Sequence, residues 1–182
     1  MGQDPDGGPD EAVDVANELQ RYAREETRLG VPPLLNVDAV HGHAYATAAT
    51  AFPNGLGAAA TSDTGAVERA ASVTAREVRA TGAHRNYGPT VDVARDPRWG
   101  RVFETFDESP HLVGAFAAAK VRGYQGGGIG DPSGVVVTTK HFPRTASRSG
   151  ARTPRPSTSP STSSGTRSFP RSSGRSTPAR PR

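Results

Sequence analysis

Cysteine is absent from this 182-residue sequence, which excludes disulfide bonds, thiolate metal sites and a cysteine nucleophile. No apolar run approaches the roughly 20 residues that span a bilayer, so we expect no membrane segment. Residues 1–10 are rich in Gly, Asp and Pro, and they lack the basic and apolar regions of a secretory signal. We therefore expect no signal peptide, and the sequence leaves the location open, with the cytoplasm as the default.

Acidic residues are missing from the last part of the chain, and their absence there explains the charge of the whole. Residues 144–182 hold nine Arg and no Lys, Asp or Glu, a net charge of +9. Residues 1–143 hold 13 basic and 18 acidic residues, a net charge of −5. The overall charge of +4 is therefore no evidence for a nucleic-acid partner, which we do not expect for the first 143 residues.

Composition divides the chain into three parts. We expect residues 1–9 to be a disordered N-terminus, whereas residues 10–143 carry enough Ala, Val, Leu and Phe to bury a core. Residues 144–182 contain 11 Ser, 6 Thr, 6 Pro and a single large apolar residue, Phe169. Such a segment cannot offset its chain entropy by burying apolar surface. We therefore predict that residues 144–182 form a disordered basic tail.

Hydrophobic periodicity predicts alternating helices and strands within residues 10–143. We expect helices over 10–29, 62–81 and 109–123, and strands over 34–37, 90–94 and 135–139. Helix-length crossovers between apolar strands are typical of a parallel sheet covered by helices, which is an α/β fold. Each expected strand is followed by charged residues, and in an α/β barrel the carboxyl ends of the strands carry the active site.

Three polar clusters follow these strands: Asp38, the Arg-Asp-Pro-Arg-Trp-Gly-Arg segment 95–101 with Glu104 beyond it, and Lys140 with His141. Segment 95–101 holds the only Trp of the chain, Trp99, between Arg98 and Arg101. Guanidinium groups bind vicinal hydroxyls or carboxylates, and an indole offers a flat face to a sugar or a base. Ion pairs within the segment would instead give it a purely structural role. Stacking on nucleobases is disfavoured by the acidic surroundings.

The other polar residues leave several roles open. Asp38 suits a nucleophile, a metal ligand, a hydroxyl acceptor or a structural acceptor. His41 and His43 have a spacing that suits zinc, but no second ligand pair follows, so we expect no metal. Lys140 follows a β-branched strand and needs an anion or a polar ligand there. The Gly-rich run 126–130 follows a helix instead of preceding one, which disfavours a phosphate loop.

Several motifs together resemble the N-terminal barrel domain of glycoside hydrolase family 3. They are Thr-Arg-Leu-Gly-Val-Pro at 27–32, Asp-Ala-Val-His-Gly at 38–42, the 95–101 segment and Lys-His-Phe at 140–142. The resemblance covers about residues 11–143. The Asp-Ala-Val-His-Gly form is most similar to the β-glucosidase and exo-glucanase branch, and the xylosidase branch is the nearest competitor. The resemblance implies an incomplete (β/α)8 barrel segment and no cofactor.

The resemblance also implies an activity and a set of substrate ligands. Family members are retaining exo-hydrolases that remove terminal, non-reducing β-linked glucosyl residues from glucosides or oligosaccharides. By motif position, the sugar hydroxyls would be bound by Asp38, Arg101, Lys140 and His141. The loop would be supported by Arg98, Trp99 and Glu104. These charged groups suit the task, because charge-assisted hydrogen bonds discriminate between hydroxyl orientations.

One departure from the family pattern bears on activity. Retention requires a nucleophile and an acid/base, two carboxylates about 5–5.5 Å apart. In the family the nucleophilic Asp lies downstream of Lys-His-Phe, whereas no acidic residue follows Asp131 here. We therefore expect this chain to be an inactive fragment that lacks both catalytic carboxylates.

The abrupt change of composition at residue 144 suggests a cause. The residues beyond it have G/C-rich codons, and we interpret them as translated from a shifted reading frame. The alternatives are a natural disordered tail and an Arg/Ser segment that binds nucleic acid. Barrel-like sequence in another frame of the coding DNA would support the frameshift, and its absence would exclude it.

Overall fold

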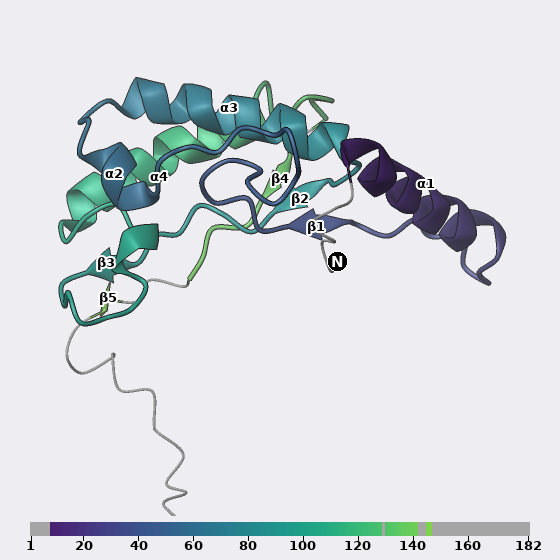
Figure 1. The fold of residues 1–182 in the computed structure, drawn as a ribbon. Coiled ribbons are helices and arrows are strands. Elements are labelled where there is room, and N and C mark those ends of the chain that lie inside the picture. The colour runs from purple at the N-terminus through teal and green to yellow at the C-terminus, as the bar shows by residue number, and fades with distance from the viewer. Residues whose placement is uncertain (1–7, 129, 142–144, 147–182) are drawn as a thin grey trace, which may run out of the picture.

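The computed structural model describes residues 8–128, 130–141 and 145–146 (Figure 1). Helices occupy Pro9–Glu25 (α1), Gly55–Ala59 (α2), Thr64–Ala80 (α3) and Pro110–Gln125 (α4), with a 3-10 helix at Val102–Glu104 (η1). Strands occupy Asn36–Val37 (β1), Arg85–Asn86 (β2), Val93–Ala94 (β3), Val136–Val137 (β4) and Thr145–Ala146 (β5). In the described part, no helix is both long enough and apolar enough to cross a membrane.

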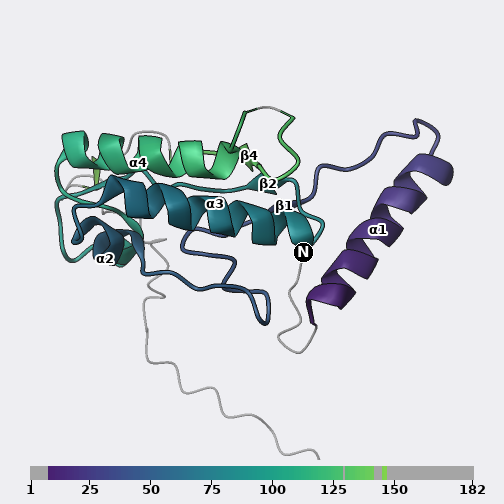
Figure 2. The ribbon, with the colours of Figure 1, turned by 90° about the horizontal axis from the view of Figure 1, so that it is seen from above.

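The strands pair in parallel, which confirms the predicted α/β class. One sheet has the order β1-β2-β4, and β3 pairs with β5. A parallel bridge between Thr90 and Lys140 lies between the two ladders. Helices α3 and α4 run side by side over one face of the β1-β2-β4 sheet (Figures 1 and 2). The described strands do not close into a barrel.

The middle strand of the sheet is not the one that the sequence predicts. The expected strand over 90–94 contributes only the Thr90 bridge and β3, and the place between β1 and β4 belongs to β2. Hydrophobic alternation does not identify β2 because both of its residues are polar. Asn86 is nevertheless fully buried. Its side chain accepts from the Ala39 amide at 2.8 Å and donates to the Ala39 carbonyl at 2.9 Å, which satisfies both groups.

Helix boundaries follow the sequence signals closely at two helices and less closely at the first. Helix α3 begins after Asp63, whose side chain caps it by accepting from the Ala66 amide at 2.9 Å. Helix α4 has the expected Pro110 in its first turn. Helix α1 ends at Glu25, earlier than the predicted residue 29. The short elements α2 and η1 lie in segments that lack any helical periodicity.

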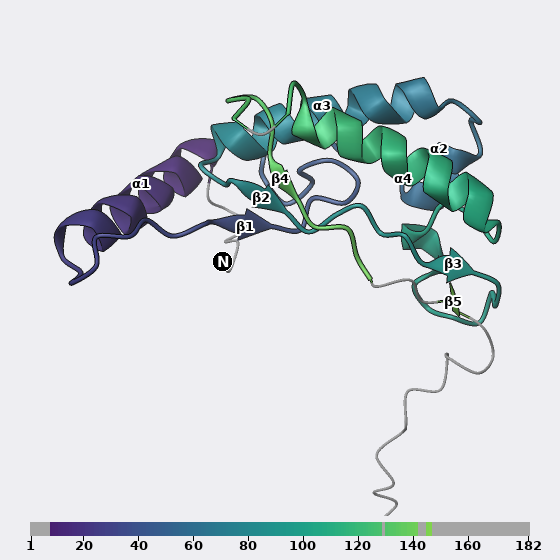
Figure 3. The ribbon, with the colours of Figure 1, turned by 180° about the vertical axis from the view of Figure 1, so that it is seen from behind.

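Helix α1 projects away from the rest of the described chain (Figures 1 and 3). The periodicity of residues 10–29 predicts an amphipathic helix with Val15, Leu19 and Tyr22 on one stripe, and these side chains are 41%, 43% and 58% exposed. Ala16 is the buried side chain of this helix. A Cβ added at Gly82 would lie 2.5 Å from the Ala16 Cβ, so the contact depends on this glycine. The helix is therefore amphipathic as predicted, but the described residues do not cover its apolar stripe.

The predicted tail is described at only two positions. Thr145–Ala146 form β5 and pair with Val93 and Ala94 of β3. Regular structure thus reaches Ala146, past the domain boundary expected at residue 143. The rest of the predicted tail, residues 1–7 of the predicted N-terminal segment, and Phe142 lie outside the described residues.

Two apolar clusters join α3 to its neighbours. Ala71, Ala75 and Val78 pack with Tyr124 and Ala39 toward the sheet, and Val67 packs with Phe106, Val113 and Phe116 toward the other end. The rings of Phe106 and Phe116 stack with their centroids 5.5 Å apart. Small side chains on α3 allow α4 to approach closely, so the contact between the two helices depends on residue volume.

Gly123 of α4 is expected to be intolerant of any side chain. A Cβ there would lie 2.2 Å from the Glu68 carbonyl oxygen and 2.7 Å from the Ala71 Cβ. We expect Gly123→Ala to lower the free energy of unfolding by about 2–3 kcal/mol, because the two helices must separate. A Cβ at Gly114 of the same helix meets nothing within 4 Å, so Gly114→Ala should stabilise by about 0.5–1 kcal/mol. Urea unfolding measures both, and equal effects would contradict the prediction.

Candidate active site

Asp38 and Lys140 meet at the carboxyl ends of two strands. Asp38 directly follows β1, and Lys140 lies three residues after β4. The Lys140 ammonium donates to both carboxylate oxygens of Asp38 at 2.7 Å. The Lys140 side chain is largely buried, whereas the Asp38 side chain is 52% exposed. The pair therefore presents a carboxylate to the surface and holds its cation beneath.

His141 follows Lys140 in the chain, and its ring contacts Arg101 and Asp92. The Nη1 of Arg101 lies 3.2 Å from Nε2 of His141, and Nδ1 of His141 lies 2.8 Å from Oδ2 of Asp92. A guanidinium only donates, so Nε2 accepts and Nδ1 carries the proton that is donated to Asp92. Both ring nitrogens of His141 are thus engaged. A sugar hydroxyl that binds Nε2 must displace the Arg101 contact.

Arg101 is held in place by Glu104. Its Nε and Nη2 donate to the two Glu104 carboxylate oxygens at 2.6 and 2.7 Å, a bidentate pair across one turn of η1. The hydrogen bonds from Arg101 lower the pKa of the Glu104 carboxyl, and those same bonds raise the pKa of Arg101. Glu104 is therefore a fixed anion that orients the guanidinium and is poorly suited to donate a proton.

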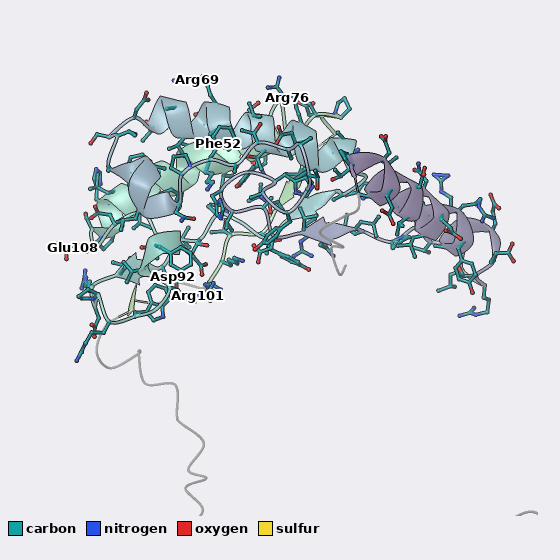
Figure 4. The ribbon with its side chains drawn as sticks, in the orientation of Figure 1. Phe52, Arg69, Arg76, Asp92, Arg101 and Glu108 are labelled. Carbon is teal, nitrogen blue, oxygen red and sulfur yellow. The ribbon has the colours of Figure 1, made fainter. Side chains whose placement is uncertain are left out.

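The other residues of segment 95–101 lie outside this network. Arg98 donates to both carboxylate oxygens of Asp96 at 2.9 and 2.7 Å. This is an ion pair within the segment, of the kind expected if the segment has a structural role. Trp99 is partly buried, and its amide donates to the Asp96 carbonyl at 3.0 Å. Figure 4 shows Arg101 and Asp92 together below α2, near β3. Arg101 is thus the residue of the segment that joins the polar cluster.

Asp92 is the site residue that sequence reasoning missed. It is only 1% exposed, and it accepts from both the ring and the backbone amide of His141. The signal was present in Thr-Val-Asp-Val, where a single carboxylate interrupts β-branched residues. A buried carboxylate in such a setting requires a hydrogen-bonded partner.

His41 and His43, whose spacing would suit a zinc site, lie in different surroundings. His43 is buried, with its Nε2 2.9 Å from the Thr81 hydroxyl. His41 lies instead on the wall of a pocket beside α3. Across the described ranges, no three His, Asp or Glu side chains gather in an arrangement that could hold a metal ion.

A parallel sheet covered by helices, with a cluster of paired charges at its carboxyl ends, defines a segment of a barrel-like α/β domain. The chain belongs to glycosyl hydrolase family 3, since residues 8–163 match the N-terminal domain of that family. That domain has an α/β barrel-like fold. The match extends past residue 143, where the motifs quoted above end.

The relatives are β-glycosidases of much greater length. Lysosomal beta glucosidase of Dictyostelium discoideum is 35% identical over 136 residues, 71% of this chain and 16% of its own. Beta-xylosidase of Formosa agariphila is 38% identical over 132 residues, 69% of this chain and 18% of its own. The structure of exo-1,3/1,4-β-glucanase from a Pseudoalteromonas species is similar at a TM-score of 0.70 and 36% identity, over 76% of this chain and 18% of that one. The chain thus spans less than a fifth of these relatives.

Proposed function

We propose that the cluster is the sugar-binding part of a retaining, exo-acting β-glycosidase, and that it holds a terminal β-linked glucosyl residue. The observation that carries this proposal is the presence of two hydrogen-bonded pairs, Asp38–Lys140 and Arg101–His141, which are adjacent because Lys140 and His141 are consecutive residues. These four residues come from three segments, which the fold brings to one end of the sheet. β-Glucosidases and an exo-β-glucanase among the relatives support the choice of substrate.

The proposed roles follow from what each group donates or accepts. The exposed Asp38 carboxylate accepts hydrogen bonds from two sugar hydroxyls, and Lys140 donates to one of them from below. Arg101, oriented by Glu104, donates to a further hydroxyl. Charge-assisted hydrogen bonds of this kind are about twice as strong as neutral ones. The sugar hydroxyls thereby replace part of the ion pairing that the cluster makes with itself.

The same cluster lacks a group suited to general acid catalysis. Asp38 faces an ammonium, Asp92 is buried against His141, and Glu104 has its pKa lowered by Arg101. Retaining hydrolysis needs one carboxyl group that is protonated at the working pH. We therefore propose that this 182-residue chain binds the sugar without cleaving the glycosidic bond.

A titration with methyl β-D-glucoside, followed by NMR, tests the binding proposal. Asp38→Asn should weaken binding about tenfold to a hundredfold, because charged hydrogen bonds are lost. Asp14→Asn is the matched control on the exposed surface of α1 and should leave affinity unchanged. Equal affinity in the wild type and Asp38→Asn would contradict the proposal. Turnover of an aryl β-glucoside by the purified chain, abolished in Asp38→Ala, would contradict the predicted lack of hydrolysis.

A β-xylosidase-type site is the second candidate, favoured by the Formosa agariphila relative. Methyl β-D-xyloside lacks the hydroxymethyl group of the glucoside and otherwise offers the same hydroxyls. Tighter binding of the xyloside than of the glucoside in the same titration would select this candidate.

A further inference from the structure

A pocket lies beside α3, and the four proposed sugar ligands do not line it. It encloses about 370 Å³, within the range of small-molecule pockets. Its walls come from α3, from α2 and from the 41–53 segment, with Phe52, Val67 and Ala70 among the apolar lining residues. Figure 4 shows Phe52 close to α3, and the side chain lines the pocket together with residues of that helix.

The charged residues of this pocket have one sign. Arg69 and Lys120 line it, together with His41, and its lining includes no Asp or Glu among the described residues. Arg69 has a partner at the rim, since its guanidinium lies 3.7 Å from the Asp63 carboxylate and is largely exposed. Lys120 is therefore the cation of this pocket that lacks a carboxylate partner among the described residues.

Lys120 is a cation without a carboxylate in the described part of the chain. Its ammonium donates to the Val40 carbonyl and lies 5.6 Å and 5.9 Å from the ring centroids of Phe106 and Tyr124. Carbonyl and ring contacts stabilise an ammonium only partly. Burial lowers the pKa of Lys120 to about 8. A desolvated cation that lacks a counter-ion gains from any anion that can reach it.

We propose that the pocket beside α3 binds an apolar monocarboxylate, whose carboxylate pairs with Lys120 and whose hydrocarbon part lies against Phe52, Val67 and Ala70. The apolar walls favour a hydrocarbon body, because its burial removes apolar surface from water. The absence of acids from the described lining removes like-charge repulsion. The single unpaired ammonium selects one negative charge, in contrast to a polyanion, which needs several donors.

Calorimetry with a matched pair of probes tests this proposal on the full chain. The probes are 4-phenylbutyrate and its uncharged analogue 4-phenylbutyramide, at pH 7. We expect the carboxylate to bind tenfold or more tightly than the amide. Lys120→Met should abolish this preference, and Ala70→Phe should abolish binding of both probes by filling the pocket. Arg76→Met removes a cation from the exposed side of α3 and should leave the affinity for both probes unchanged.

Each outcome of these measurements either supports or overturns the proposed carboxylate site. Equal affinity of the two probes for the wild-type chain would overturn the proposal, and this comparison requires no variant to fold. A preference that survives in Lys120→Met would also overturn it, provided that circular dichroism shows an unchanged fold. Competition by methyl β-D-glucoside would overturn the separation of the two sites. Loss of sugar binding in Asp38→Asn with phenylbutyrate binding intact would support two independent sites.

Discussion

Replacing Lys120 with methionine is expected to raise the free energy of unfolding at pH 7 by about 2 kcal/mol, although the change removes a charge and a hydrogen bond. The reason is the fall of the Lys120 pKa from 10.5 to about 8, which corresponds to about 3 kcal/mol of penalty on the protonated form. Methionine keeps the length of the side chain and has no charge to desolvate. It leaves the Val40 carbonyl without this donor, which costs about 1 kcal/mol.

The pH dependence of stability gives the same prediction a second readout. The folded pKa of Lys120 is lower than the unfolded one, so between about pH 8 and 10.5 the unfolded chain binds more protons. The penalty is fully present below pH 8 and disappears as the pH rises toward 10.5. The advantage of Lys120→Met should therefore shrink across this window. Other groups that titrate there are common to both proteins and cancel in the difference.

Lys140→Met is the matched control, since Lys120 and Lys140 are the only lysines of the chain. Lys140 is paired with Asp38, so its removal should give no stabilisation at pH 7. Denaturant unfolding at pH 7 and pH 10 measures all three proteins. A Lys120→Met variant that is less stable than the wild type at pH 7 would show that the ammonium is well solvated in the folded state.

The sequence predicts the helices and the fold class better than the strands. Apolar periodicity and local caps, such as Asp63 and Pro110, act within one segment and survive in the folded chain. The middle strand β2 depends on Asn86, whose burial is stabilised by bonds to Ala39, 47 residues away. No local pattern records such a partner. The same limit explains why the apolar stripe of α1 could be detected while its exposure could not.

The candidate site shows a similar division. Asp38, Arg101, Lys140 and His141 stand out because a charged residue at a strand end is conspicuous, and the structure brings them together. Their sugar-binding role remains a proposal. The sequence does not predict which of these charged residues pair with one another, because the pairs depend on the folded arrangement of distant segments. Lys120 falls on the inward face of a helix, where the sequence shows no partner for its charge.

Removing the Asp92 carboxylate is expected to disconnect His141 from the site. In Asp92→Ala the ring loses its Nδ1 acceptor, and we expect sugar affinity to fall about tenfold or more as a charge-assisted hydrogen bond is lost. We also expect the free energy of unfolding to fall by about 1.5–3 kcal/mol. Asp92→Asn keeps an acceptor oxygen at the same place and should recover most of the affinity.

The tautomer of His141 distinguishes positioning from a general loss of stability. In the wild type, Asp92 holds the proton on Nδ1 and Arg101 donates to Nε2. Without Asp92, the Nε2–H form, the usual form of a solvated histidine, should become populated, and Arg101 would lose its acceptor. Nitrogen-15 NMR of the imidazole ring reports this exchange directly. An Asp92→Ala protein that keeps the Nδ1–H tautomer and full sugar affinity would show that Asp92 only supports the fold, whereas a tautomer restored by Asp92→Asn would identify it as the positioning residue for His141.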